Sequence, residues 1–265
     1  MLRRCASAAA KQPRWRSSAF EYAAAAATAT RLRHRESTHE ASTKDANHYD
    51  PAQDHAVNNE AAKPPMNNPI DFYFDFSSPY GYFAAMRIDE LATRHGRQVR
   101  WQPYLMGVAM KLSGAQPLTA RELVKDYATH DLARTARLYG LPFALPTPFP
   151  IATVAAARAF WWLNERDIGQ AKVLAKALYR AYFADGRNIG ESAVVSDVAV
   201  HNGIERSTMD AALADDKVKA KLKTVTENAI AAGVFGSPFF IVDGEAFWGN
   251  DRVSQVDEWL SRGGW

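Results

Sequence analysis

The sequence predicts an α/β fold in which a large all-α domain is inserted into a small sheet unit. Residues 70–76 alternate with the period of a strand and end at a Ser-Pro dipeptide that can start a helix. Residues 233–252 contain a second Ser-Pro dipeptide, then a strand, an Asp-Gly turn and another strand. The segment between, from about residue 106 to residue 232, has helical periods and no strand signal. A β-α-β unit followed by helices, a β-hairpin and a closing helix is the order of a thioredoxin-like fold.

The first strand has one apolar and one polar face: Ile70, Phe72, Phe74 and Phe76 alternate with Asp71, Tyr73 and Asp75. Ser77 or Ser78 is a good N-cap for the helix that follows, and Pro79 suits the first helical position because proline has no N–H to leave unpaired. Because a helix N-terminus carries about half a positive charge, an anion beside Ser78 is stabilised by about 0.3–1 kcal/mol. The alternative is an ordinary strand-to-helix junction in which Ser78 is only a cap.

The same periodicities predict the other elements. Residues 97–105 alternate and are expected to form a second strand parallel to the first. A helix is expected over residues 118–139, with Thr119 as its N-cap and Glu122 as the capping-box partner. The last helix runs from Arg252 to about Ser261 and is capped by Asn250 or Asp251. Further helical periods cover residues 151–164, 167–184, 191–201, 207–213 and 215–232.

These elements predict four segments. Residues 1–65 are an extension, residues 69–105 and 233–265 are the two parts of a thioredoxin-like domain, and residues 106–232 are the inserted helical domain. A ligand cleft is expected between the two domains, because binding sites commonly form there.

The extension has two readings. Residues 1–35 contain eight Lys or Arg and one acidic residue among many Ala and Ser, as mitochondrial transit peptides do. The alternative is a disordered tail, or a start codon placed too far upstream of Met66. Residues 36–65 have no apolar period and resemble a solvated linker. The protein is therefore expected in the cytoplasm, or in the mitochondrial matrix if residues 1–35 are a transit peptide.

Composition excludes several classes of function. Residues 66–265 hold 22 Lys or Arg against 22 Asp or Glu, so nothing argues for a nucleic-acid or membrane partner. No run of 18 apolar residues suggests a membrane span. The single cysteine, Cys5, lies in the extension, which rules out dithiol chemistry in the domain. No metal site is expected, and no histidine lies near Ser78 in the sequence to act as its base.

Two motifs carry a resemblance to a known family. DFYFDFSSPYGYFA at residues 71–84 and GVFGSPFFIVDGEAFWGNDR at residues 233–252 resemble the 2-hydroxychromene-2-carboxylate isomerase family and its relatives, the kappa-class glutathione transferases. The resemblance implies a glutathione-dependent isomerase whose partners are glutathione and a small aromatic substrate, and it implies a homodimer. It also implies that the glutathione thiolate adds to the substrate transiently and that elimination gives trans-o-hydroxybenzylidenepyruvate.

The resemblance also implies the site residues. Ser78, before Pro79, matches the catalytic serine that contacts the sulfur of glutathione. Ser237 matches the residue before a cis-proline, here Pro238, whose backbone pairs with the cysteinyl part of glutathione; a trans bond in an ordinary loop is the alternative. The γ-glutamyl end is expected at Trp248, Gly249, Asn250 and Asp251. Asp251 would bind the α-ammonium group, act as a plain N-cap, or do both.

The chain departs from the family pattern at two places. Kappa-class relatives carry an asparagine where this chain has Ala115, and isomerase relatives often read Phe-Pro-x-Asn where this chain has Phe-Pro-Ile-Ala over residues 149–152. Both positions concern the second substrate more than glutathione. Two alternatives to an isomerase therefore stay open, which are a kappa-type glutathione transferase and a non-catalytic thioredoxin-like module that binds glutathione or a peptide.

Overall fold

The computed structural model describes residues 68–265, so the predictions for the extension lie outside the described residues. These residues form a four-stranded sheet with the order β2-β1-β3-β4. Strand β1 (Ile70–Phe74) pairs in parallel with β2 (Val99–Pro103). It pairs antiparallel with β3 (Phe239–Val242), which in turn pairs antiparallel with β4 (Glu245–Trp248). The parallel pair and the C-terminal hairpin therefore share one sheet, as the sequence predicts.

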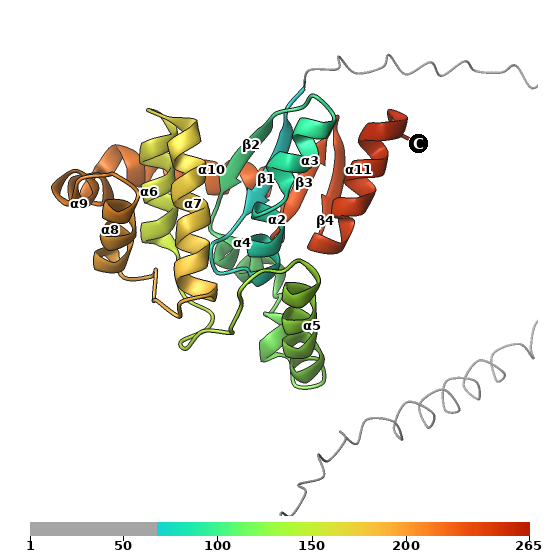
Figure 1. The fold of residues 1–265 in the computed structure, drawn as a ribbon, viewed down its shortest axis with the longest axis horizontal. Helices are drawn as coiled ribbons and strands as arrows, with labels where there is room; N and C mark the ends of the chain where they lie inside the picture. The colour runs from blue at the N-terminus through green and yellow to red at the C-terminus, as the bar shows by residue number, and fades with distance from the viewer. Residues whose placement is uncertain (1–67) are drawn as a thin grey trace, which may run out of the picture. The chain divides into compact units, whose positions relative to one another are not determined.

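Helices connect and surround these strands. Helices α2 (Pro79–Ala85) and α3 (Ile88–Arg94) join β1 to β2, and a short 3-10 helix η3 (Asn250–Arg252) leads from β4 into α11 (Val253–Arg262). In Figure 1, α6 to α9 gather on one side of the sheet, α11 lies on the opposite side, and α5 projects below. The helices between β2 and β3 are α4 (Met106–Ser113), the 3-10 helix η2 (Leu118–Ala120), α5 (Lys125–Leu138), α6 (Val154–Asn164), α7 (Ile168–Phe183), α8 (Ser192–His201), α9 (Arg206–Ala214) and α10 (Asp216–Ala231).

Both faces of the sheet are covered. On one face Phe72 and Phe74 are fully buried, and the Phe74 ring lies 5.8 Å from the ring of Tyr179 in α7. Burying a side chain of this size contributes about 1.5–3 kcal/mol, so this aromatic face is a main source of stability. On the other face, Tyr73 and Phe239 pack with residues of α4 and α10. The helical segment thus contributes to the core on both sides of the sheet, and its description as a separate domain stays a prediction.

The structure differs from the sequence predictions at three places. The helix after Ser78 is short: α2 ends at Ala85 and α3 begins at Ile88, and between them the guanidinium of Arg87 lies 3.9 Å from the centroid of the Tyr139 ring. The predicted capping box at residues 119–122 does not form: α5 begins only at Lys125, without a side-chain cap, and Glu122 instead pairs with Lys125 at 2.9 Å. Strand β1 ends at Phe74, so Asp75 lies in the turn that follows the strand and is buried there.

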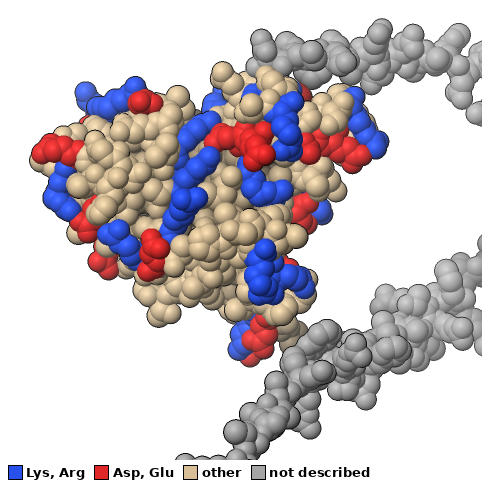
Figure 2. All heavy atoms as spheres, in the orientation of Figure 1, with Lys and Arg blue, Asp and Glu red and all other residues tan. Residues whose placement is uncertain are grey.

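Charges of both signs are interspersed on the surface. Figure 2 shows Lys and Arg beside Asp and Glu over much of the visible face, with uncharged surface between them. Lys172 and Lys176 of α7, for example, both pair with Asp89 of α3, at 2.8 and 3.0 Å. Of the helices in residues 68–265, none is long and apolar enough to cross a membrane.

Candidate active site

Ser78 is the buried N-cap of α2. The residue is 4% exposed, and its Oγ accepts a hydrogen bond from the Gly81 N–H at 3.0 Å. Pro79 occupies the first position of the helix, so the local prediction for this junction is confirmed. The Ser78 hydroxyl also donates to the carbonyl oxygen of Ser237 at 2.8 Å. Ser78 is therefore a cap that also bonds to the second Ser-Pro dipeptide, 159 residues away.

Ser237 joins this junction through its side chain and its backbone. Its Oγ accepts a hydrogen bond from the Asp75 N–H at 3.0 Å, while its carbonyl accepts from Ser78. The Ser237–Pro238 peptide bond is cis, so the trans alternative is wrong. Ser237 is 9% exposed, and no hydrogen bond joins its N–H to another of the described residues. That N–H is available to an added extended chain.

The junction is packed closely around Gly81. A Cβ atom at Gly81 would lie 2.7 Å from Tyr179 Oη and 2.8 Å from Ser237 Oγ, closer than side chains pack. Tyr179 itself donates a hydrogen bond to the carbonyl of Asp75 at 3.0 Å. In a thioredoxin Cys-x-x-Cys motif the second sulfur would stand at residue 81, and here a glycine lets α2 approach both partners.

The segment after β4 continues from the same loop. The Gly249 N–H donates to the Pro238 carbonyl at 3.0 Å, which ties this segment to the Ser237 loop, and η3 packs against α2. Gly249 has a φ of 114°, and a Cβ there would lie 2.4 Å from Asp251 Oδ1. The structure therefore brings the segment of residues 248–251 beside the Ser237 loop and α2, and its predicted role toward the γ-glutamyl end stays a prediction.

Asn250 and Asp251 differ in their surroundings. Asn250 is 6% exposed; its Nδ2 donates to Tyr139 Oη at 3.2 Å, and its buried Oδ1 has no partner among the described residues. The Asp251 side chain is 73% exposed and pairs with Arg252 Nη1 at 3.0 Å. Neither caps α11, which begins at Val253 without a side-chain cap, so that prediction is wrong. Both side chains are left with capacity for a polar ligand.

Sequence reasoning missed two contributors to the site. Asp75 and Tyr139 reach it through hydrogen bonds to Ser237 and Asn250. Asp75 could have been suspected as a lone acid at the end of a strand, directly before Ser-Ser-Pro. Tyr139 gave no signal, because its contact depends on how α5 packs.

The site has no activated nucleophile of its own. The Ser78 hydroxyl bonds only to backbone groups, whereas His95 pairs with Asp257 at 2.6 Å and His201 with the Asp197 carbonyl at 2.8 Å. Residues 68–265 contain no cluster of three or more His, Cys, Asp or Glu that could hold a metal ion. A hydroxyl at a helix N-terminus, without a base, is suited to hydrogen-bond an anion.

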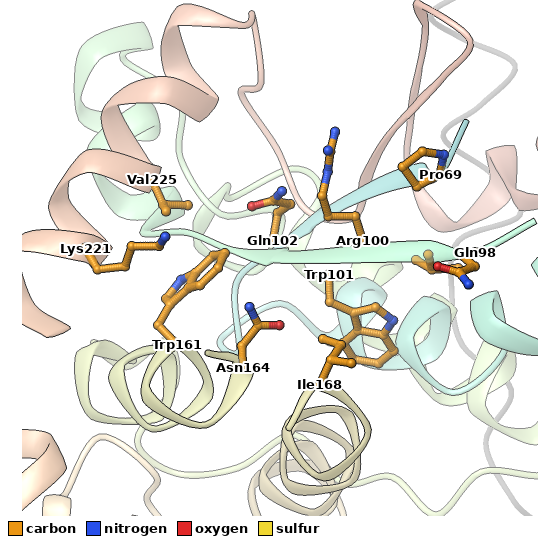
Figure 3. A pocket seen from close by; sticks show the side chains of 11 residues that line it. Pro69, Gln98, Arg100, Trp101, Gln102, Trp161, Asn164, Ile168, Lys221 and Val225 are labelled. Atoms are coloured by element: carbon orange, nitrogen blue, oxygen red, sulfur yellow. The ribbon is translucent and has the colours of Figure 1, made fainter. Parts of the chain in front are cut away.

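A pocket of about 500 Å³ lies elsewhere. It runs along β2, which contributes Trp101 and Gln102 to its lining, while the inserted helices contribute Trp161 and Lys221 (Figure 3). None of the predicted site residues lines it. This hollow between the sheet and the helices therefore does not coincide with the Ser78 site.

Three comparisons with known proteins identify similar chains. The DSBA-like thioredoxin domain matches residues 69–261. A 2-hydroxychromene-2-carboxylate isomerase of Sphingobium xenophagum is 28% identical over 197 residues, which are 74% of this chain and 99% of that protein. Glutathione S-transferase kappa 1 of Caenorhabditis elegans is 27% identical over 208 residues, 73% of this chain and 91% of that protein. A solved structure of a 2-hydroxychromene-2-carboxylate isomerase has a TM-score of 0.67 and 27% identity, and the match covers 74% of this chain and 95% of that one.

These similarities confirm the predicted resemblance to both groups of proteins. They also confirm the predicted fold class, a thioredoxin-like α/β fold with a large set of inserted helices. The roles of the individual site residues stay predictions.

The close approach at Gly81 gives a first prediction. Alanine there raises helix propensity by about 1 kcal/mol, but overpacking of the junction costs about 1–3 kcal/mol. We expect Gly81→Ala to lower the free energy of unfolding by roughly 1 kcal/mol, measured by urea denaturation. Gly107→Ala in α4 is the matched control, since a Cβ there meets no atom within 4 Å. Equal stabilities for the two variants would contradict the prediction.

Proposed function

The chain belongs to the DSBA-like thioredoxin domain family, and we propose that it is a glutathione-dependent isomerase. Its substrate is 2-hydroxychromene-2-carboxylate or a similar intermediate of aromatic breakdown. The names of the curated relatives and of the similar solved structure support the reaction class. The name of the kappa-class relative supports the use of glutathione.

One observation carries the proposal. The Ser78 hydroxyl, at the N-terminus of α2, lies 2.8 Å from the carbonyl of Ser237, so the two Ser-Pro motifs form one site. A thiol held there meets a hydroxyl donor and the positive end of a helix. Both favour the thiolate form, because each stabilises negative charge on sulfur.

Several groups around Ser78 are suited to binding glutathione. The N–H and carbonyl of Ser237 offer a donor and an acceptor to the cysteinyl part, in the manner of an added strand. The exposed carboxylate of Asp251 offers an acceptor to an ammonium group, and beside it Asn250 has a buried Oδ1 without a partner in residues 68–265. Trp248 is 56% exposed and its ring lies 4.8 Å from that of Phe235, so this aromatic pair offers an apolar wall.

Ser78 acts as a hydrogen-bond donor in this proposal. When bound, glutathione supplies the thiol that adds to the substrate and is released unchanged at the end. The Ser78 hydroxyl hydrogen rotates about its C–O bond, so it can turn from the Ser237 carbonyl to a thiolate without backbone movement. Because Ser78 has no neighbouring base, it holds and stabilises the anion and does not attack the substrate.

A kappa-type glutathione transferase is the second candidate, favoured by the similarity to the kappa-class relative. It would use the same Ser78 and Asp251 but would release a conjugate. A third candidate, of another class, is a non-catalytic module that binds glutathione or a thiol peptide at the same residues. The three differ in what happens to the thiol after binding.

The fate of glutathione separates these functions. The full chain is mixed with 2-hydroxychromene-2-carboxylate and a small amount of glutathione, and the product is followed by absorbance and mass spectrometry. Many turnovers per glutathione, with an isomer as product, support the isomerase. A thioether formed in a one-to-one ratio indicates the transferase, and binding without turnover indicates the third candidate. No heat on titration of glutathione would contradict the isomerase and the transferase, and would leave only a module that binds a different thiol peptide.

Removal of the Ser78 hydroxyl tests its assigned role. We expect Ser78→Ala to lower kcat by on the order of 10²-fold, as for the loss of one positioned donor at a developing charge. Ser77→Ala is the matched control, because the neighbouring hydroxyl only accepts a 3.3 Å hydrogen bond from the Ile151 N–H. Steady-state kinetics of both variants provide the measurement. Unchanged rates in Ser78→Ala would mean that this serine is only a helix cap.

Asp251 is tested through binding. If its carboxylate holds the α-ammonium group, Asp251→Asn should weaken glutathione binding about tenfold, since a charge-assisted hydrogen bond contributes about 1.5–3 kcal/mol and the amide keeps part of it. The exposed Asp216 of α10, whose side chain is 93% exposed, provides the control Asp216→Asn. Calorimetry measures the glutathione affinity of both variants. Equal affinities would show that Asp251 does not contribute to binding.

The proposal includes a homodimer. Leu112 of α4 and Leu123 and Leu138, near the two ends of α5, are 72%, 98% and 75% exposed. Large apolar side chains with this exposure are candidates for burial at an interface. We expect light scattering of the purified chain to give twice the mass of one chain, and a monomer at micromolar concentration would contradict this.

A further inference from the structure

Asp75 is a buried acid that connects the site to the inserted helices. The residue is 5% exposed and directly follows β1, three residues before Ser78. Oδ1 accepts hydrogen bonds from the Ser77 N–H and from Thr153 Oγ1, both at 2.8 Å. Oδ2 accepts from the Met106 N–H, also at 2.8 Å, at the first residue of α4. Three separate segments therefore converge on one carboxyl group.

The backbone of Asp75 holds the site from the other side. Its N–H donates to Ser237 Oγ at 3.0 Å, and its carbonyl accepts from the Ser78 N–H at 2.9 Å. The same carbonyl accepts from Tyr179 Oη at 3.0 Å. Asp75 is thus one residue that bonds directly to both serines of the site.

A buried acid without a counter-ion is a costly feature. None of the salt bridges in residues 68–265 includes Asp75, and the groups that face its carboxyl are two backbone N–H groups and one hydroxyl. Burial raises the pKa of Asp75, and its hydrogen bonds with Ser77, Thr153 and Met106 oppose that rise. An apolar residue of similar size would avoid the desolvation cost, so packing alone does not account for an acid here.

We propose that Asp75 is a positioning residue of the site: its carboxyl group, bonded to Ser77, Thr153 and the start of α4, sets the distance between Ser78 and Ser237. This inference rests on the proposed function only for its consequence in catalysis. Asp75 does not touch the substrate; it acts through the two serines. The geometry itself can be measured without any substrate.

Thr153 gives a way to disturb Asp75 without touching the site. It is 2% exposed and donates one hydrogen bond to Oδ1. Thr153→Val keeps the shape and removes the donor, whereas Thr153→Ser keeps the donor. Asp75→Asn is the second variant. The asparagine side chain has one accepting oxygen and one donating NH₂ group, so the NH₂ group faces at least one of the N–H or hydroxyl donors that now bond to the carboxylate.

A thiol at residue 78 reports the geometry. In a full-length Ser78→Cys chain that also carries Cys5→Ser, the thiol occupies the N-cap position that receives the Gly81 N–H. Its pKa is measured by the pH dependence of thiolate absorbance or of alkylation. The helix end stabilises the thiolate at residue 78 only while the turn at residues 75–78 keeps its geometry. Thr153→Val and Asp75→Asn should therefore raise the pKa of this thiol by about half a unit or more. Thr153→Ser should leave it unchanged.

The outcomes are distinct. A fall in the thiol pKa in Asp75→Asn, without any change in Thr153→Val, would show that Asp75 acts only through its charge, which would overturn the proposal. An unchanged pKa together with a lower melting temperature would show a purely structural acid, and this also overturns it. If Asp75→Asn does not fold, the comparison of Thr153→Val with Thr153→Ser still tests the proposal.

The kinetic arm uses the chain with Ser78 intact. Thr153→Val should lower kcat about tenfold, as a small misplacement of a reacting group can, and Thr153→Ser should keep kcat within about twofold. A rise in thiol pKa without any glutathione turnover by the wild-type chain would leave the positioning role standing and remove the proposed function. Normal kcat in Thr153→Val would overturn the positioning role even if the proposed function holds.

Discussion

The structure depends on the hydrogen bonds that join the end of β1 to the Ser237 loop. Ser78 donates to the Ser237 carbonyl while the Asp75 N–H donates to Ser237 Oγ, so two bonds span about 160 residues of sequence. Both are buried, and a buried donor or acceptor left unpaired costs about 1–3 kcal/mol. These hydrogen bonds therefore hold the end of β1 and the Ser237 loop together at the N-terminus of α2.

The inserted helices are part of this arrangement. Thr153, just before α6, and Met106, at the start of α4, both donate to the carboxyl group of Asp75. Tyr179 of α7 donates to the Asp75 carbonyl and packs against the aromatic face of the sheet. A change in the packing of these helices would consequently shift the positions of Ser78 and Ser237, although neither serine belongs to the helical segment.

The chemistry follows from what occupies the helix end. A thioredoxin-like enzyme with sulfur at this place uses its own thiolate, whereas this chain has Ser78 and Gly81 and no cysteine in residues 66–265. The same helix end can stabilise a thiolate that a ligand brings. The proposed use of glutathione thus follows from two features: a helix N-terminus that can stabilise a thiolate, and a protein that has no thiol of its own at that helix end.

Local signals in the sequence determined the strand alternation, the cap at Ser78 with Pro79, the hairpin turn and the helical middle of the chain, because these depend on neighbours a few residues apart. Capping predictions failed at Glu122 and Asp251, where salt bridges with nearby residues compete for the side chains. Only the tertiary structure decided the burial of Asp75, the close approach at Gly81 and the contact between the two Ser-Pro motifs. Each of these depends on which distant segments pack together, and residue periodicity carries no record of that.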